Sequence, residues 1–278
     1  MKTFKGKAIY KPAGKAAEYS AWACNFYKGC SNGCTYCYLK KGVLAHAMGG
    51  HKPELKSCFK NEAHALYVFE KELKANLPEL QKHGLFFSFT TDPMLPETEF
   101  LTMEAADIAI GNDIPVKILT KCVQWVDGFL EMSNNYEDAY TGLQNWRKMF
   151  AFGFTLTGHD ELEPGASTNA ERIEAMKALH EAGFKTFASI EPIVDFDSSL
   201  RMIFETVEFC DLYKIGLMSG KKYPAYDLQV FMNRASGYIK ALNKKVYFKD
   251  SFFKQAELQR LSYSSGIYVE RDYNLFNP

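Results

Sequence analysis

The sequence predicts an α/β protein with the architecture of a partial (β/α)6 TIM-like barrel. Short apolar segments rich in Val, Ile, Phe and Thr alternate along the chain with longer segments of helical periodicity. Strands that are separated by helices pair in parallel through right-handed crossovers, so this alternation predicts a parallel sheet covered by helices. Six such units are found instead of the eight of a closed barrel.

The expected strands are short apolar segments bounded by polar or turn-forming residues. The first, YSAWACNF over residues 19–26, leads directly into a cysteine-rich loop. The other expected strands cover residues 85–91, 116–120, 150–157, 185–191 and 212–218, and residues 245–248 are a further candidate.

The segments between these strands predict helices because their apolar residues recur at helical spacing. One side of the segment 62–82 collects Leu66, Phe69, Leu73, Leu77 and Leu80. The remaining expected helices cover residues 101–112, 169–182, 198–209 and 226–243. Residues 124–146 predict a helix and a connecting segment, with a turn at Asn134 and Asn135.

We expect one domain, because no repeat, low-complexity tract or Pro/Gly-rich linker divides the 278 residues. Within residues 1–278, the pattern predicts a basic N-terminal extension over 1–18 and a barrel core over 19–220. A C-terminal helix and tail are expected over 221–278.

Composition predicts a globular, cytoplasmic protein without a membrane anchor. Hydrophobic residues make up 47% and charged residues 24% of the chain, and no apolar run approaches the roughly 18 residues of a membrane helix. The N-terminal residues lack the apolar region of a signal peptide. Seven cysteines, three of them in one loop, argue against a disulfide framework and for a reducing compartment.

Three cysteines within eight residues, Cys30, Cys34 and Cys37, are the strongest chemical signal in the chain. Thiolates at this spacing can hold three irons of a [4Fe–4S] cluster, and the absence of a fourth nearby cysteine leaves one iron open. Zinc is the alternative, but it prefers four ligands in closely spaced pairs. Cys24, Cys58, His46 and His51 do not have that spacing, so the pattern favours the cluster.

The CxxxCxΦC pattern, with Tyr36 as its aromatic residue, resembles the radical S-adenosylmethionine (SAM) superfamily. The resemblance implies that SAM binds the open iron and is cleaved by reduction to a 5′-deoxyadenosyl radical. It also implies an external electron donor of the flavodoxin or ferredoxin type. The stretches NFYKGCSNGCTYCYLKKG, FSFTTDPMLPETEF and LEPGASTNAERIEAMKALHEAGFKTFASIEPIV resemble the spore photoproduct lyase-like branch, which is also called the "DNA repair photolyase" group.

Hydroxyl and carboxylate side chains at two predicted strand ends are candidate SAM ligands. Thr90, Thr91 and Asp92 end the second strand, where the resemblance implies a contact with the methionyl amino group of SAM. The alternative is a plain turn that begins at Asp92. Thr155 and Thr157 alternate on the fourth strand and could reach the ribose or the carboxylate of SAM, although Thr is also common in strands.

Arg172 and Glu191 are two further candidates for cofactor binding. Arg172 could hold the SAM carboxylate by a two-pronged contact or form a surface pair with Glu171 or Glu174. Glu191 ends the fifth strand, where an unpaired carboxylate is costly, so a contact with SAM or substrate is expected.

Two cysteines outside the motif, Cys58 and Cys122, are candidate hydrogen-atom donors. Spore photoproduct lyases use a separate downstream cysteine for this step, but neither residue matches its position convincingly. This departure argues against spore photoproduct repair itself.

The charge distribution suggests a polyanionic substrate. Residues 1–60 contain 11 Lys against Glu18 and Glu54, whereas the rest of the chain is acidic. Nucleic acid or a nucleotide is therefore the expected substrate, with Tyr27, Tyr38 and Phe59 available to stack on bases. A solvated lysine-rich surface explains the charge equally well. The other functions left open are modification of a peptide or small metabolite and a non-catalytic Fe–S sensor.

Overall fold

A mostly parallel eight-stranded sheet forms the frame of the protein. We describe a computed structural model, which covers residues 7–139, 146–263, 266–271 and 273–276. The sheet runs in the order β1-β2-β5-β6-β7-β8-β9-β10, and every neighbouring pair is parallel except β1 with β2. Its strands are β1 (Ile9–Tyr10), β2 (Ala23–Cys24), β5 (Leu85–Phe87), β6 (Val116–Thr120), β7 (Phe150–Thr155), β8 (Lys185–Ile193), β9 (Leu212–Leu217) and β10 (Lys245–Phe248).

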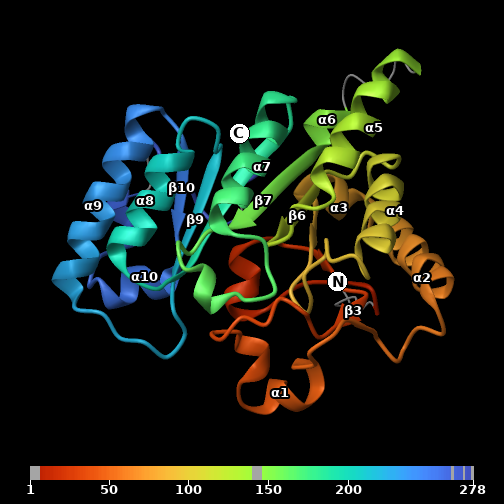
Figure 1. Ribbon diagram of the computed structural model, residues 1–278, viewed down its shortest axis with the longest axis horizontal. Helices are drawn as coiled ribbons and strands as arrows, with labels where there is room; N and C mark the ends of the chain where they lie inside the picture. Colours follow the sequence, from red (N-terminus) through yellow and green to blue (C-terminus); the bar gives the residue numbers. More distant parts are fainter. Residues whose placement is uncertain (1–6, 140–145, 264–265, 272, 277–278) are drawn as a thin grey trace.

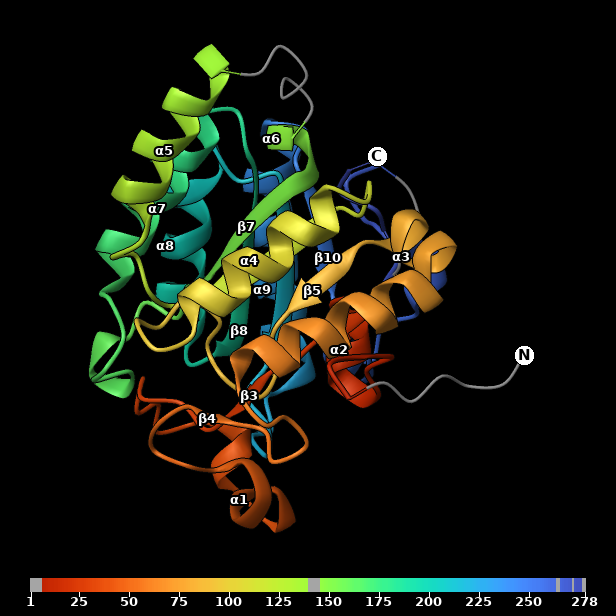
Figure 2. The ribbon, with the colours of Figure 1, turned by 90° about the vertical axis from the view of Figure 1, so that its right-hand side faces the viewer.

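Helices cover the outer face of this sheet, and short elements surround the carboxyl ends of its strands (Figures 1 and 2). The covering helices are α2 (Glu62–Ala75), α3 (Leu77–His83), α4 (Glu99–Ile110), α5 (Val126–Ala139), α6 (Trp146–Met149), α7 (Asn169–Glu181), α8 (Phe196–Thr206) and α9 (Ala225–Ala241). The short elements are β3 (Tyr27–Lys28), β4 (Glu54–Leu55), η1 (Gly14–Glu18), η2 (Tyr38–Lys40), α1 (Val43–Met48), η4 (Asp160–Leu162), α10 (Asp250–Gln255) and η5 (Arg260–Tyr263). None of the described helices is both long and apolar enough to cross a membrane.

The expected α/β class and parallel sheet are confirmed, and β10 adds a seventh parallel strand. The single helix expected over 62–82 was wrong, since α2 and α3 are separate and Pro78 lies in the first turn of α3. Proline has no backbone N–H and clashes with the carbonyl group four residues earlier, so the first helix cannot continue through it.

The turn expected at Asn134 and Asn135 was also wrong, because α5 is continuous through both residues. The helix is held by aromatic packing, in which Phe129 lies 5.1 Å from Phe152 and 5.2 Å from Phe184 between ring centroids. This packing outweighs the small helix-propensity penalty of two Asn residues. Residues 140–145, in the expected connecting segment, lie outside the described residues.

The inside of the curved sheet is filled by side chains from alternate strand positions. One buried cluster contains Tyr19, Ala23, Phe86, Ala151, Phe187, Leu212 and Leu275. At Gly153, an added Cβ atom would lie 2.3 Å from the Phe187 ring, so this position needs glycine. These residues fill part of the space inside the curved sheet.

The η1 segment links the two edges of the sheet. The Glu18 carbonyl accepts a hydrogen bond from Lys214 Nζ on β9 at 2.8 Å. The buried Glu18 carboxylate accepts from Tyr247 Oη on β10 at 3.0 Å and from the Asp250 amide at 2.7 Å. Residues 14–18 therefore pack against the barrel wall.

Candidate active site

The cysteine loop, residues 30–37, lies across the mouth of the barrel just after β2 and β3. It is held by backbone hydrogen bonds to the loop that follows β7. The Thr35 amide donates to the Leu162 carbonyl at 2.9 Å, and the Gly165 amide donates to the Asn32 carbonyl at 2.9 Å. The spacing of the cysteines is local, but their position over the barrel depends on this distant loop.

A cavity of about 410 Å³ opens beneath the cysteine loop. It is bounded by that loop, by η1 and by the carboxyl ends of the parallel strands. Of the candidate metal- and cofactor-binding residues, eight line it: Cys30, Cys34, Tyr36, Cys37, Thr91, Asp92, Thr155 and Glu191. The barrel mouth thus gathers most of the candidates in one place, whereas Thr90, Thr157, Arg172, Cys58 and Cys122 are not among the lining residues.

The three motif cysteines are free thiols that share one wall of this cavity. Within the described residues, no group of three or more His, Cys, Asp or Glu side chains is arranged to hold a single metal ion. A [4Fe–4S] cube presents a separate iron to each thiolate, so its ligands need not converge on one point. Three thiolates on one wall and no fourth cysteine among the cavity-lining residues therefore fit a cluster with one open iron.

Asp92 anchors the cysteine loop to the strand ends. Its Oδ2 accepts from Asn32 Nδ2 and from the Lys121 amide, both at 2.8 Å. Its Oδ1 accepts from Thr120 Oγ1 at 2.6 Å and from the Met94 amide at 3.0 Å. Four donors from the protein thus bond to the Asp92 carboxylate, which gives this residue a structural role. A contact between Asp92 and SAM remains a prediction.

Thr90 and Thr91, which directly precede Asp92, have different surroundings. Thr91 lines the cavity, and its buried Oγ1 has no hydrogen-bond partner in the described structure. A buried hydroxyl without a partner is costly, so a ligand group that bonded to it would gain free energy. Thr90 Oγ1, by contrast, donates to the Tyr27 carbonyl at 2.6 Å. The geometry therefore favours Thr91 over Thr90 as a ligand contact.

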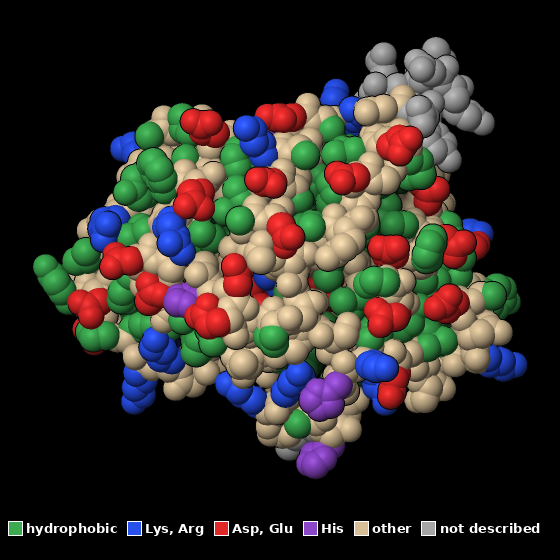
Figure 3. Space-filling view, viewed as in Figure 1, with side chains coloured by type: hydrophobic (Ala, Val, Ile, Leu, Met, Phe, Trp, Pro, Cys, Tyr) green, Lys and Arg blue, Asp and Glu red, His purple; other side chains and the backbone are tan. Residues whose placement is uncertain are grey.

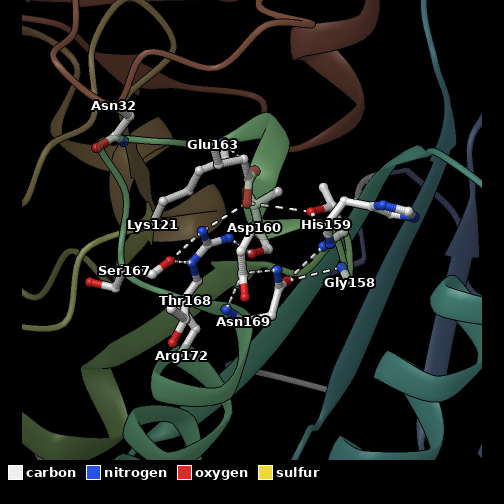
Figure 4. A network of polar contacts seen from close by, with 12 residues as sticks. Asn32, Lys121, Gly158, His159, Asp160, Glu163, Ser167, Thr168, Asn169 and Arg172 are labelled. Carbon is white, nitrogen blue, oxygen red and sulfur yellow. Dashed lines mark hydrogen bonds and ion pairs between the residues drawn. The ribbon is translucent and has the colours of Figure 1, made fainter.

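A buried ionic network is centred on Glu163 (Figure 4). Its Oε2 pairs with Arg172 Nη2 at 2.7 Å and accepts from Thr157 Oγ1 at 3.3 Å, and both side chains of the ion pair are fully buried. The Tyr36 hydroxyl donates to Glu163 Oε1. Lys121 Nζ lies 3.9 Å from the same oxygen, beyond hydrogen-bond distance, and its side chain also lines the cavity.

Arg172 braces the loop after β7 rather than facing the cavity. Its Nε donates to the Ser167 carbonyl at 2.8 Å, and Nη1 donates to the Thr155 carbonyl at 2.7 Å. Arg172 is fully buried and pairs with Glu163, so the alternative of a surface pair with Glu171 or Glu174 was wrong. A contact between Arg172 and SAM remains a prediction, and it is not supported by the cavity, because Arg172 is not among the lining residues.

A second polar cluster lies on the wall formed by β8 and β10. Glu191 Oε2 pairs with Lys249 Nζ at 2.6 Å and accepts from Tyr19 Oη at 2.8 Å. Lys249 also donates to the Lys15 carbonyl at 3.1 Å and is 1% exposed. An anionic substrate group is therefore not favoured at Lys249, because Glu191 already neutralises its charge.

The two candidate hydrogen donors lie outside the cavity lining. Cys122 is buried, and its Sγ contacts Asn32 Oδ1 at 3.6 Å, directly behind the cysteine loop. Cys58 is half-buried and packs against the main core. Their proposed role remains a prediction, and Cys122 is better placed for it because it contacts the loop.

Sequence reasoning gave no role to Asn32, Tyr19 or Ser189. Asn32 is buried and bonds to Asp92. Ser189 and Glu191 are two residues apart in a strand and so share a face, a signal that was available in the sequence. Nothing local marks Tyr19, because its partners lie 170 and 172 residues further along the chain.

His159 links the loop after β7 to the start of α8. Its Nε2 bonds to Asp195 and lies 3.0 Å from Ser198 Oγ, and its Nδ1 lies 2.7 Å from Glu161 Oε1. Partial burial lowers the pKa of His159, but the hydrogen bonds to Asp195 and Glu161 raise it, with a net upward shift. Burial raises the pKa of Asp195, but hydrogen bonds from the Ser198 hydroxyl and amide, and from His159, lower it to about 2.

These contacts predict a loss of stability above neutral pH. A raised folded-state pKa stabilises the protein fully below the unfolded value of about 6.5, and this contribution disappears as pH rises through the folded value. The urea midpoint of wild type should therefore fall between pH 6 and pH 8.5. The decrease in urea midpoint should be smaller in His159→Gln. An equal pH dependence of the midpoint in the two proteins would contradict the stabilising role of protonated His159.

Comparisons with known proteins agree with this architecture. The family model of the radical SAM superfamily matches residues 24–210. An uncharacterized protein of Methanocaldococcus jannaschii, MJ0683, is 25% identical over 232 residues, which cover 81% of this chain and 80% of that protein.

Among solved structures, a spore photoproduct lyase variant matches with a TM-score of 0.62 at 15% identity, over 89% of this chain and 79% of that chain. SuiB of Streptococcus suis bound to S-adenosylmethionine matches with a TM-score of 0.56 at 14% identity. That match covers 85% of this chain and 52% of SuiB. At these identities, the likeness to solved structures shows the shared fold.

The fold and the cavity define an enzyme that works at the mouth of an α/β barrel. The family match covers most of the chain, and the chain belongs to the radical SAM superfamily. Its cofactors are accordingly a [4Fe–4S] cluster and SAM, and it requires an electron donor.

Proposed function

We propose that this enzyme cleaves SAM reductively and abstracts a hydrogen atom from a nucleic acid or a nucleotide. The observation that supports the chemistry is that Cys30, Cys34 and Cys37 line one cavity, which Thr91 and Lys121 line as well. When bound, the cluster and SAM supply an adenosyl radical. The protein binds and orients SAM and shields it from water.

The cavity offers SAM one unpaired hydroxyl and one weakly paired cation. The ammonium group of Lys121 has Glu163 at 3.9 Å as its ionic partner, and we propose that it binds the SAM carboxylate. The unpartnered hydroxyl of Thr91 is suited to the amino or carboxylate group of SAM. We also propose a flavodoxin or ferredoxin as the electron donor and the cytoplasm as the compartment.

Removing these groups should weaken SAM binding without loss of iron. Loss of a hydrogen bond to a charged group costs on the order of 1.5–3 kcal/mol, so Lys121→Met and Thr91→Val should raise the Kd for SAM. The measurement is equilibrium binding of SAM to anaerobically reconstituted protein. Thr90→Val is the matched control, because the Thr90 hydroxyl is bonded to a carbonyl group. Unchanged SAM affinity in both cavity variants would refute these assignments.

Lysines around the cysteine loop support a nucleic-acid substrate. Figure 3 shows Lys and Arg side chains along the edge of the molecule around α1, whereas Asp and Glu side chains are spread over the covering helices. Lys41 and Lys52 are exposed, and Lys40 is half-buried. Phosphates bound there would bring a polymer to the rim of the barrel mouth.

Two of the aromatic residues expected to stack on bases do not fit that role. Tyr27 is 5% and Phe59 is 6% exposed, because both pack into the core beside the cysteine loop. Tyr38 is 48% exposed, and its hydroxyl donates to the Phe89 carbonyl. Of the three, Tyr38 alone could meet a base at the surface.

Titration with single- and double-stranded DNA and RNA at two salt concentrations tests the substrate class. Binding that depends on phosphates releases counterions, so the affinity should fall steeply with salt. The double variant Lys40→Ala/Lys41→Ala should weaken binding of every polymer and reduce the salt dependence. Lys177→Ala on α7 is the control, since its neighbour is Glu181. The absence of salt-sensitive binding would reject a polymeric substrate.

A further inference from the structure

The polar cluster opposite the cysteines has an acceptor that the protein does not use. Glu191 Oε2 is bonded to Tyr19 and Lys249, but Glu191 Oε1 has no partner among the described residues. Glu191 lines the cavity and is 17% exposed in its side chain. A partly buried carboxylate oxygen without a donor is costly, so it is suited to a ligand.

The surrounding backbone leaves room for this carboxylate. At Gly216 on β9, an added Cβ atom would lie 2.7 Å from Glu191 Oε1 and 2.9 Å from Lys249 Cδ. Any larger residue would therefore push the charged pair out of place. Glycine at this position keeps the two side chains at the cavity wall.

The direction of the hydrogen bonds shows what kind of ligand fits. Burial and the nearby Glu191 raise the pKa of Tyr19 well above its usual range, so its phenol keeps its proton and donates to Glu191. Ser189 Oγ, 2.6 Å away, then donates to the Tyr19 oxygen. The chain of bonds ends on Glu191 Oε2, so Oε1 of this cavity-lining residue is left as an acceptor without a donor.

An anion does not fit this wall. Lys249 is almost fully buried, and its ammonium group contacts Glu191, the Lys15 carbonyl and the face of the Tyr19 ring, 4.2 Å from the ring centroid. A phosphate here would meet the Glu191 carboxylate and be repelled. The phosphates of a nucleic acid therefore belong on the outer lysines, and a neutral part of the substrate belongs inside.

A flat apolar surface lies in the same cavity. The half-buried ring of Phe89 lines it and is stacked on Phe86, with centroids 4.5 Å apart and planes 12° apart. Pro192, Leu217 and Met218 line it as well. An aromatic face and apolar walls beside one acceptor fit a heterocyclic base with its sugar better than a free sugar or a flexible chain.

We propose that Glu191, supported by Tyr19, Ser189 and Lys249, is the specificity residue that accepts a hydrogen bond from an uncharged N–H or O–H group of the substrate nucleoside. The proposal rests on the proposed function and adds which part of the substrate enters the cavity. A base in a duplex would have to be flipped out to reach this subsite.

Binding of free nucleosides tests the subsite. Reconstituted enzyme, saturated with 5′-deoxyadenosine and methionine to fill the cofactor region, is titrated calorimetrically with the four deoxynucleosides. The deoxynucleoside that binds most tightly is then compared with its N-methylated and its 3′-O-methylated forms. One methylation should weaken binding by about 10- to 150-fold, and the one that does so identifies the donor as base N–H or sugar O–H. Failure of all four nucleosides to bind, or indifference to both methylations, would overturn the proposal.

Two variants separate the subsite from general damage. Glu191→Gln and Gly216→Ala should both abolish the discrimination against the methylated nucleoside. Gly128→Ala is the matched control, since an added Cβ atom there meets nothing within 4 Å. Should Glu191→Gln fail to fold, the wild-type comparison of methylated nucleosides still decides the question.

The same variants show whether the acceptor serves SAM instead. Weakened SAM binding in Glu191→Gln with unchanged nucleoside binding would assign Glu191 to the cofactor and reject the subsite. Formation of 5′-deoxyadenosine from SAM with dithionite tests the proposed function separately. Wild type that does not cleave SAM rejects the function, whereas intact cleavage without nucleoside discrimination rejects only this inference.

Discussion

Replacing Cys30, Cys34 or Cys37 by Ala is expected to abolish the iron–sulfur cluster and SAM cleavage together. Anaerobically reconstituted wild type should bind about four irons per chain, as a cubane requires, and form 5′-deoxyadenosine with dithionite. Each cysteine lines the same cavity wall, and no other cysteine among the described residues does. The protein therefore has no substitute ligand at that wall, and each single variant should lose activity completely.

Iron analysis, the visible absorption spectrum and chromatographic detection of 5′-deoxyadenosine measure this result. Cys58→Ala is the matched control, because Cys58 lies outside the cavity lining and should leave the iron content unchanged. A full cluster in the triple variant would refute the ligand assignment, as would stoichiometric zinc in wild type. A wild-type cluster without SAM cleavage would instead support the Fe–S sensor.

Removal of the Arg172 guanidinium should produce the largest loss of stability. The side chains of Arg172 and Glu163 are both fully buried, and Arg172→Met leaves the carboxylate with hydroxyl bonds from Tyr36 and Thr157 and a distant ammonium group. Breaking a buried pair on one side costs about 3–5 kcal/mol of unfolding free energy. Urea unfolding of the apoprotein measures it.

A double-mutant cycle identifies the cause. Arg172→Met combined with Glu163→Gln should restore part of the lost stability, because the buried uncompensated charge is removed. The exposed pair of Lys177 and Glu181 is the control, and Lys177→Met should cost no more than about 0.5 kcal/mol. A loss below 1 kcal/mol in Arg172→Met would contradict the assigned role of the pair.

The cysteine motif illustrates what a local sequence pattern determines. Its three cysteines lie within eight residues, so their chemistry depends on spacing that the chain itself sets. The strands were predictable for a similar reason, since short apolar segments between helices become buried parallel strands. Their ends were less accurate: the strand expected over 19–26 is regular only at Ala23–Cys24. Strand ends depend on pairing with neighbours, which lie far away in the sequence.

The sequence by itself determined the class of fold and the cluster motif, because each depends on residue types at short range. The resemblance of that motif to the radical SAM superfamily implied SAM as the second cofactor. The tertiary structure decided what each charged side chain does. Arg172 was equally compatible with SAM, Glu171 or Glu174, and its burial beside Glu163 settled its ion pair. Glu191 and Lys249 are 58 residues apart and form a pair only because β8, β9 and β10 are adjacent in the sheet. The energy of a charge depends on its burial and on its partners in space, and neither can be read from a linear chain.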